Sequence, residues 1–165
     1  MPAAITIKLS RTASAADIPL PKKMTDHSAG FDLCAAVIES ITIQPGQIAL
    51  IPCGFHMALP VGYEAQIRPR SGLASRNGIT LINSPGTIDS DYRGEVICPI
   101  INLGHNPFTI ERGMRIAQML IAPVPQVKIV EVEQLDETTR GSGGFGHTGT
   151  GNLKKPAKQI AKKKR

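Results

Sequence analysis

The 165-residue sequence has no tryptophan, four phenylalanines and two tyrosines. A hydrophobic core must therefore be built mainly from Ile, Val, Leu, Ala and Met. No apolar run approaches the roughly 18 residues that a membrane span requires, and the N-terminus lacks the charged start, apolar run and cleavage site of a secretory signal. We therefore expect a cytoplasmic protein, or a nuclear one if the source is eukaryotic.

Cysteine is scarce as well. Cys34, Cys53 and Cys98 form an odd set without C-x-x-C spacing. The four histidines lack the short spacing of a zinc site. These patterns favour a reducing compartment, in which the cysteines act as small, buried apolar residues.

Excess charge is confined to one end of the chain. Seven of the 19 Lys and Arg residues lie within residues 152–165, which contain no acidic residue, so residues 1–151 hold 12 basic and 13 acidic residues. The formal net charge of +6 therefore belongs to the tail. The body gives no reason to expect nucleic-acid binding, whereas the tail fits either a nucleic-acid contact or a solvated, disordered segment.

Short β-rich segments recur between clusters of Gly, Pro, Asn and Asp, and this rhythm predicts an all-β sandwich or barrel. In chain order they are Ile5–Leu9, Phe31–Val37, Ile41–Ile43, Gln47–Ile51, Tyr63–Arg68, Ile79–Ile82, Glu95–Asn102, Phe108–Ile110, Arg115–Ala122 and Gln126–Val132. The run Val96–Ile101 is apolar on both faces, which predicts a strand covered on both sides, by this chain or by another subunit. Pro99 within it predicts an edge or bulge position.

The length of the chain predicts one domain with a sizeable core. We expect a β domain over residues 1–134, a glycine-rich mobile arm over 135–151 and a disordered basic tail over 152–165. Within the β domain, Ser71–Ser75 is predicted to form a helical turn with Ser71 as its N-cap.

One segment combines carboxylates with a phenol. Gly86–Gly94, with the sequence GTIDSDYRG, places Asp89, Asp91 and Tyr92 in a predicted hairpin. Taken alone, it fits a solvated turn. It equally fits a general base, an ion-binding acid and an aromatic wall presented on a rigid hairpin.

Other segments carry groups that suit an anion. Arg70-Ser71-Gly72 combines a planar cation, a hydroxyl and a small residue at a predicted helix start, although an ordinary capped turn also fits. Residues 140–148, RGSGGFGHT, offer many free N–H groups beside Phe145 and fit either a linker or a segment that orders around a polyphosphate and a base. They lack the lysine and the following helix of an ATP-binding P-loop.

Two strands contribute isolated polar groups. Asp32 lies where one strand begins, and Arg115 and Gln118 lie among the hydrophobic residues of another. Polar side chains on a buried strand need partners.

Taken together, these five segments resemble, in order and spacing, the five sequence motifs of the trimeric dUTPase family, over roughly residues 24–150. The runs PRSGLA and GTIDSDYRG are the most specific. The resemblance implies a jelly-roll β subunit and a dUTP diphosphatase that hydrolyses dUTP to dUMP and pyrophosphate, thereby limiting uracil in DNA and supplying dUMP for dTMP synthesis. It also implies a homotrimer with three active sites, each built from all three chains.

The same resemblance implies roles for individual residues. Asp32 would hold Mg²⁺ through waters while the triphosphate chelates the metal, and Asp89 would be the general base for the water that attacks the α-phosphorus. Substrate contacts fall on Arg70, Ser71, Gly72 and Gln118 for the phosphates, on Asn83, Gly86, Thr87, Ile88 and Tyr92 for uracil and deoxyribose, and on Arg140, Phe145 and Gly146 in the closing arm. The pattern departs from many relatives at His147, where they have serine.

Two alternatives stay open at this point. A dCTP deaminase of the same fold would release ammonia from dCTP. A nucleic-acid-binding role for the tail would be an accessory property, motivated by Lys154, Lys155, Lys158, Lys162, Lys163, Lys164 and Arg165.

Overall fold

The computed structural model describes residues 4–147 and 149. The chain divides into two units, Met1–Val127 and Lys128–Arg165. The predicted boundaries at residues 134 and 151 stay predictions, and the basic tail of residues 152–165 lies outside the described part of the chain.

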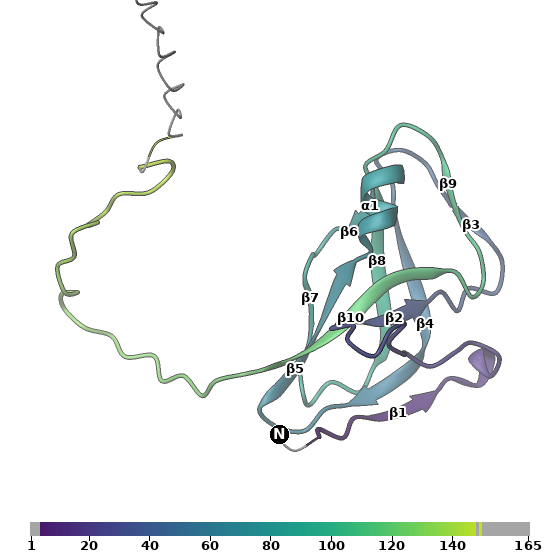
Figure 1. Ribbon diagram of the computed structural model, residues 1–165, viewed down its shortest axis with the longest axis horizontal. Coiled ribbons are helices and arrows are strands. Elements are labelled where there is room, and N and C mark those ends of the chain that lie inside the picture. Colours follow the sequence, from purple (N-terminus) through teal and green to yellow (C-terminus); the bar gives the residue numbers. More distant parts are fainter. Residues whose placement is uncertain (1–3, 148, 150–165) are drawn as a thin grey trace, which may run out of the picture. The chain divides into compact units, whose positions relative to one another are not determined.

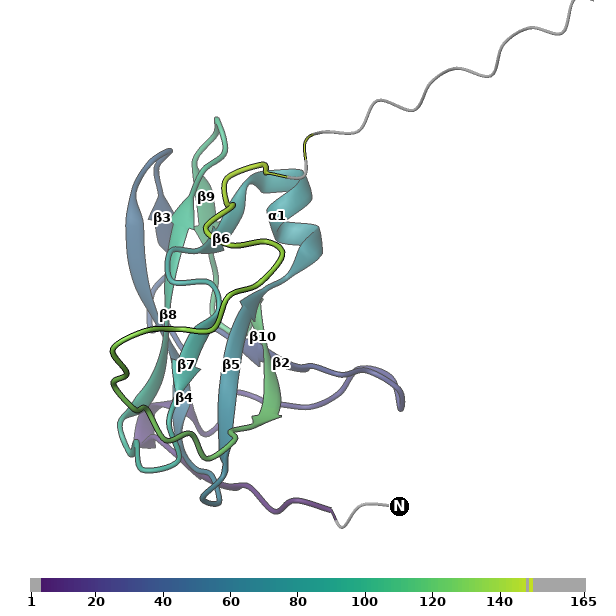
Figure 2. The ribbon, with the colours of Figure 1, turned by 90° about the vertical axis from the view of Figure 1, so that its left-hand side faces the viewer.

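The first unit is built from two four-stranded antiparallel sheets and one strand pair (Figure 1). One sheet has the order β1-β4-β8-β6, with β1 Lys8–Arg11, β4 Ile48–Ala58, β8 Glu95–Asn102 and β6 Ile79–Leu81. The other has the order β2-β10-β5-β7, with β2 Phe31–Cys34, β10 Arg115–Pro123, β5 Tyr63–Pro69 and β7 Gly86–Ile88. Figure 2 shows β5, β10 and β2 of this sheet side by side. The pair consists of β3 Ile41–Ile43 and β9 Phe108–Ile110, and two short helices, η1 Ala13–Ala15 and α1 Ser71–Asn77, complete the unit.

The core draws on both sheets, because alternate residues of each strand point inward. Leu33 of β2, Ile51 of β4, Cys98 of β8 and Ile116 of β10 belong to one buried cluster. Asn102 is fully buried at the end of β8, and its amide donates to the carbonyls of Ile43 and Asn106 at 2.9 and 2.8 Å. The scarcity of aromatics is thus met by an aliphatic core.

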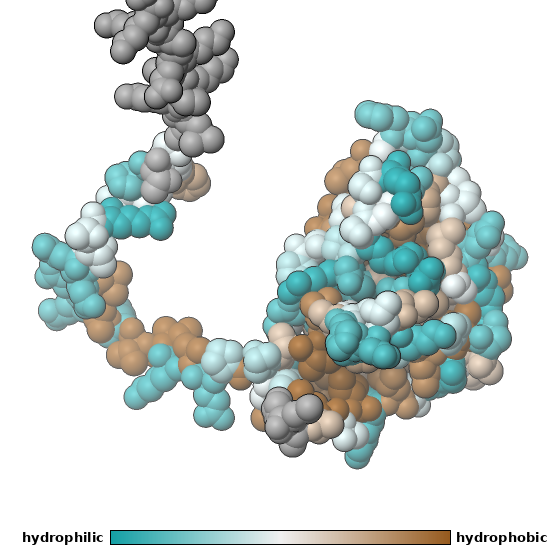
Figure 3. Space-filling view, viewed as in Figure 1, coloured by the Kyte–Doolittle hydropathy of each residue, from teal (hydrophilic) through white to brown (hydrophobic). Residues whose placement is uncertain are grey.

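The all-β prediction is confirmed, but one predicted strand is wrong. Residues 126–132 form no strand in the described structure. Their apolar side chains are exposed, including Val127 at 76% and Ile129 at 93%, and Figure 3 shows brown apolar residues along the segment that follows β10. A strand needs a partner edge for its hydrogen bonds, and none is supplied to this segment within the described chain.

The helix also differs from the prediction. α1 begins after Arg70, which takes the N-cap position without a side-chain hydrogen bond, so Ser71 is not the cap. The helix continues to Asn77 and ends at Gly78, whose φ of 68° allows its N–H to reach the carbonyls of Ala74 and Leu73.

Pro99 lies in the sheet interior rather than on an edge strand, because β8 pairs with both β4 and β6. Its carbonyl accepts from the N–H of Ile82 at 3.0 Å, and the return bond is missing because proline has no N–H. β6 accordingly stops at Leu81, so the proline ends the ladder with β6.

The outer face of the β4–β8 pair is apolar and uncovered in the single chain. Leu50 and Ile48 are 67% and 53% exposed, and Ile97 on β8 is 46% exposed. The single chain therefore covers only one face of β8, and cover of the other face by another subunit stays a prediction.

The second unit has turns but no helix or strand among its described residues. Arg140 donates from Nε to the carbonyl of Gly143 at 2.8 Å, and the N–H of Gly141 reaches the carbonyl of Thr138 at 3.0 Å. Phe145 is fully exposed and has a φ of 45°. Among residues 4–147 and 149, no helix has the length and apolar character to cross a membrane.

Candidate active site

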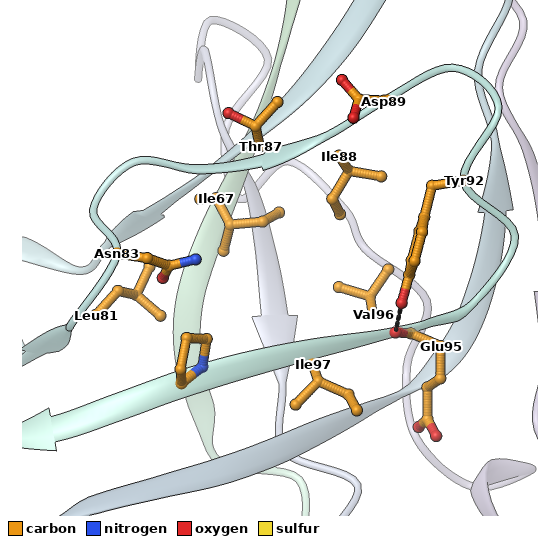
Figure 4. A pocket seen from close by; sticks show the side chains of 12 residues that line it. Ile67, Leu81, Asn83, Thr87, Ile88, Asp89, Tyr92, Glu95, Val96 and Ile97 are labelled. Carbon is orange, nitrogen blue, oxygen red and sulfur yellow. Dashed lines mark hydrogen bonds between the residues drawn. The ribbon is translucent and has the colours of Figure 1, made fainter.

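The hairpin predicted from Gly86–Gly94 borders a cavity of about 260 Å³. Its lining consists of Ile67, Leu81, Asn83, Gly86, Thr87, Ile88, Asp89, Tyr92, Glu95, Val96, Ile97 and Pro99, and is called the hairpin cavity below. Figure 4 shows Asn83 and Tyr92 on opposite sides of this cavity. The structure therefore brings together six of the predicted site residues: Asn83, Gly86, Thr87, Ile88, Asp89 and Tyr92.

Strand pairing and two glycines shape the hairpin cavity. β7 pairs with β5 in the register Ile67↔Gly86 and Ala65↔Ile88. A Cβ on Gly86 would lie 3.1 Å from the Asn83 amide nitrogen, and one on Gly94 would lie 2.2 Å from the Tyr92 hydroxyl oxygen. Glycine is thus required at position 94 for the tyrosine ring to take its place.

The phenol and the carboxylate are both accessible at the hairpin cavity. Tyr92 is 45% exposed, and its hydroxyl donates to the carbonyl of Glu95 at 3.1 Å. The N–H of Tyr92 donates to the carbonyl of Asp89 at 3.2 Å, which closes a turn between them. An apolar floor with a side-chain amide and an exposed carboxylate at its border suits a planar polar ligand beside a water that the carboxylate can deprotonate.

A second cavity, also of about 260 Å³, is lined by Met24, Asp32, Arg70, Ser71, Gly72, Arg115 and Gln118. It is called the arginine cavity below. The Asp32 carboxylate accepts from Arg115 at 3.0 Å and lies 3.7 Å from the Arg70 guanidinium, which also donates to the Arg115 carbonyl at 3.0 Å. One carboxylate between two guanidinium groups leaves a net positive charge, which favours an anionic ligand.

Strand register explains why these residues meet. Gln118 of β10 lies opposite Asp32 of β2 on one side and Arg68 of β5 on the other. The Gln118 amide donates to the carbonyl of Pro69 at 3.0 Å, directly before Arg70. A Cβ on Gly30 would lie 2.6 Å from the Gln118 side-chain oxygen, so the glycine admits this glutamine.

The arginine cavity fits a divalent cation only in part. No group of three His, Cys, Asp or Glu side chains is close enough to hold a metal within the described residues. Asp32 is one carboxylate whose charge two arginines already balance. Mg²⁺ commonly keeps several waters and takes one carboxylate plus phosphate oxygens, so this side chain suits a metal that arrives on a phosphorylated ligand.

The two cavities share no lining residue. The structure therefore separates the predicted site residues into the Asp89 group and the Asp32 group. Arg140, Phe145 and Gly146 lie in the second unit, Lys128–Arg165. Sequence reasoning left Arg115 and Met24 out of the site. The occurrence of Arg115 and Gln118 on one hydrophobic strand could have indicated Arg115 as a site residue. No sequence pattern indicated Met24.

The cysteines show no sign of chemistry. Burial raises the pKa of the Cys34 thiol. A contact with Cys98, whose sulfur lies 3.6 Å away, and burial together raise the pKa of Cys53. All three are buried and unpaired in the described structure, and neutral buried thiols are poor nucleophiles. The prediction of small apolar residues is confirmed.

Comparisons with known proteins show which family and fold the chain resembles. A family model described as dUTPase matches residues 16–149. The deoxyuridine 5′-triphosphate nucleotidohydrolase of Caldanaerobacter subterraneus subsp. tengcongensis is 58% identical over 145 residues, covering 88% of this chain and 98% of the relative. That of Rhizobium leguminosarum bv. trifolii is 56% identical over 146 residues, covering 87% and 94%.

Solved structures extend the likeness. The chain resembles the dUTPase of Staphylococcus bacteriophage 80alpha with dUpNHpp, with a TM-score of 0.77 at 24% identity over 87% of this chain and 98% of that one. A mutant dUTPase from phage phi11 of S. aureus, described with a structural Mg(II) ion, has a TM-score of 0.71 at 20% identity over 80% and 99%. At these identities the likeness shows the fold, and it confirms the jelly-roll prediction.

Proposed function

This chain belongs to the dUTPase family, and from that membership we infer that it hydrolyses dUTP to dUMP and pyrophosphate. The observation that carries the inference furthest is the 58% identity with a named nucleotidohydrolase over 98% of that relative's length. The alternative of a dCTP deaminase is not favoured, because the similar relatives share the dUTPase name.

The hairpin cavity supports the binding of uracil and deoxyribose. Asn83 and the backbone of residues 86–88 offer the donors and acceptors that a uracil edge requires, while Ile67 and Val96 provide an apolar floor. Tyr92 would pack against the sugar. A ring held there leaves no room for a 2′-hydroxyl, and steric exclusion of this kind would reject UTP.

Asp89 would supply the chemistry. Its carboxylate is exposed at the hairpin cavity, where it can orient a water and take its proton as the water attacks the α-phosphorus. A positioned general base contributes typically about 10²–10⁴-fold to the rate. Pyrophosphate is the leaving group.

The arginine cavity supports the binding of the triphosphate by Arg70, Ser71, Gly72 and Gln118. Asp32, oriented by Arg115, would meet a magnesium ion through waters. Bound on the triphosphate, the ion would offset negative charge as it develops on the phosphates. Guanidinium groups provide similar charge stabilisation from the protein side.

Separate cavities on one chain support a shared site. A substrate whose base lies in the hairpin cavity and whose phosphates reach Arg70 and Asp32 needs both halves, and copies of the chain arranged as a trimer can supply them to each other. The exposed apolar face around Leu50 and Ile97 gives such copies a surface to bury. From the second unit, Phe145 would stack on the base and Arg140 would bind the terminal phosphate. Gly146, next to Phe145, would belong to the same segment as it closes over the nucleotide.

The purified protein with Mg²⁺ should be given dUTP, UTP, dTTP and dCTP in parallel while pyrophosphate release is followed. We expect release from dUTP far above the other three. Equal rates on all four, or no release from dUTP, would contradict the function, and ammonia release from dCTP would support the deaminase instead.

A further inference from the structure

The loop between β7 and β8 carries two residues of the proposed reaction, and burial does not hold it in place. Asp89, Asp91, Tyr92 and Arg93 are all exposed. A loop with so little buried surface depends on hydrogen bonds for a defined conformation.

Hydrogen bonds within the loop close it on itself. Arg93 donates from one guanidinium nitrogen to the carbonyls of Ser90 and Tyr92, at 2.8 and 2.7 Å. With the Asp89–Tyr92 turn and the Tyr92–Glu95 bond, these contacts make residues 89–95 a compact local unit. They do not fix that unit relative to the sheets.

A contact from β4 provides that attachment. His56 lies opposite Glu95 in the β4–β8 register, and its Nδ1 atom lies 3.0 Å from the carbonyl oxygen of Arg93. Because a carbonyl only accepts, Nδ1 must be the protonated donor. The bond joins residues 37 positions apart in the sequence. β4 is itself held on both sides at this point, since His56 also lies opposite Ser10 of β1.

A neighbouring contact anchors the start of β8 to the same part of β4. The Glu95 carboxylate accepts from the N–H of Gly54 at 3.0 Å. The carbonyl of Glu95 in turn accepts from the Tyr92 hydroxyl. The tyrosine ring is therefore located by two contacts with β4, one at each end of residues 93–95.

We propose that His56 is a positioning residue for sugar selection, acting through the carbonyl of Arg93 on the place of the Tyr92 ring. This role rests on the proposed function. Without the imidazole donor, the loop keeps its internal bonds but can shift as a unit, and the ring then leaves room for a 2′-hydroxyl. Displacement of Asp89, which belongs to the same unit, lowers hydrolysis of both nucleotides alike, so the ratio of dUTP to UTP hydrolysis isolates the effect on the ring.

Three substitutions separate the hydrogen bond from the bulk of the ring. His56→Leu removes the hydrogen-bond donor. His56→Asn keeps an N–H donor on a nitrogen bonded to Cγ, the position that Nδ1 has in histidine. His56→Gln moves the N–H donor one bond further out, to the position of Nε2. The kcat/KM of each variant is measured on dUTP and on UTP. We expect the dUTP:UTP ratio to fall about tenfold in His56→Leu and His56→Gln and to stay within about twofold in His56→Asn, since contact between a pocket and one small group discriminates by roughly 10- to 200-fold.

A loss of folded protein lowers both rates equally and leaves the ratio unchanged, so destabilisation cannot imitate the effect. In a Tyr92→Ala background, adding His56→Leu should leave the ratio where Tyr92→Ala puts it. If the wild-type protein hydrolyses dUTP and the ratio in His56→Leu equals the wild-type ratio, this inference falls while the proposed function stands. An equal fall in His56→Asn also overturns it. Absence of dUTP hydrolysis in the wild type would contradict both the proposed function and the role of His56.

Discussion

The hairpin cavity and the arginine cavity have the same volume, about 260 Å³, but their side chains are of opposite kinds. Aliphatic residues such as Ile67 and Val96 floor the first, whereas Arg70, Arg115 and Asp32 dominate the second. The first suits recognition by shape and by a few hydrogen bonds, and the second suits charge.

In the proposed reaction, the two cavities are specialised halves of one site. Selection of base and sugar requires a rigid shape that rejects a wrong group by contact. Binding of a triphosphate requires cations and little shape. Because the halves share no lining residue, each can be altered without touching the other, and the predictions below use that separation.

The largest effect is expected at the carboxylate of the hairpin cavity. Asp89→Asn should lower kcat on dUTP by about 10²–10⁴-fold, because an amide cannot accept the proton of the attacking water, while the dissociation constant of a non-hydrolysable dUTP analogue changes little. Steady-state kinetics and calorimetry measure the two. Asp91→Asn in the same loop is the matched control and should keep wild-type turnover, since Asp91 does not line the cavity. Full activity of Asp89→Asn would remove this residue from its role.

A substitution outside both cavities tests whether the halves need assembly. Leu50→Asp places a charge on the exposed apolar face, and a charge without a partner in a buried interface costs about 3–5 kcal/mol. We expect sedimentation to show dissociation into single chains and activity to fall by at least about tenfold. Ile38→Asp, on a residue that is 84% exposed between β2 and β3, is the control. An active monomeric Leu50→Asp protein would show that one chain suffices.

A smaller effect is expected in the arginine cavity. Arg115→Ala removes a hydrogen bond to a charged group, an interaction worth about 1.5–3 kcal/mol, and lowers the positive charge around Asp32. The dissociation constant of the dUTP analogue should rise about 10- to 100-fold. Arg68→Ala, on a neighbouring strand but outside the cavity, should leave it near wild type. Unchanged affinity in Arg115→Ala would mean that the cavity does not take the phosphates.

The smallest effect concerns a contact between two residues, Asp17 and Arg112, that line neither cavity. Hydrogen bonds from Arg112, the closest at 2.6 Å, hold the pKa of Asp17 below its ordinary value of 3.8. A lowered pKa gives stability that is present above the unfolded pKa and is lost as the pH falls through the folded pKa. The melting temperature of Asp17→Asn should therefore lie slightly below wild type at pH 7, and the gap should close below about pH 4. A gap that persists at pH 2 would exclude the charge as its cause.

The sequence predicted much of the fold, because alternating apolar residues mark strands wherever one face is buried. Glu95–Asn102 and Phe108–Ile110 match the observed strands end for end. Gln126–Val132 carries the same signal but has no partner edge in the described chain, and periodicity alone cannot supply one. The interior position of Pro99 likewise depends on where β6 stops, which only the assembled sheet determines.

Motif resemblance named candidate site residues one by one, and their roles stay predictions, but it did not predict how the structure groups them. Nothing in the spacing shows that Asp32 and Asp89 border different cavities, since that follows from how the sheets pair. Arg115 emerged only in the structure, where the register pairs it with Cys34 and its guanidinium donates to the Asp32 carboxylate. His56 belongs to no motif, and its contact with Arg93 depends on the irregular β4–β8 pairing between Pro52 and His56.

Mixing two inactive proteins tests the division of the site most directly. Asp89→Asn damages the hairpin half and Arg70→Ala the arginine half, and the two chains, carrying different tags, are co-expressed and purified as mixed assemblies. If each site joins the hairpin half of one chain to the arginine half of another, one of the three sites in every mixed trimer combines two intact halves, so about a third of the sites are restored, and dUTP hydrolysis at low substrate should recover to roughly that share of the wild-type rate. Activity no higher than that of the two parents would contradict a site shared between chains.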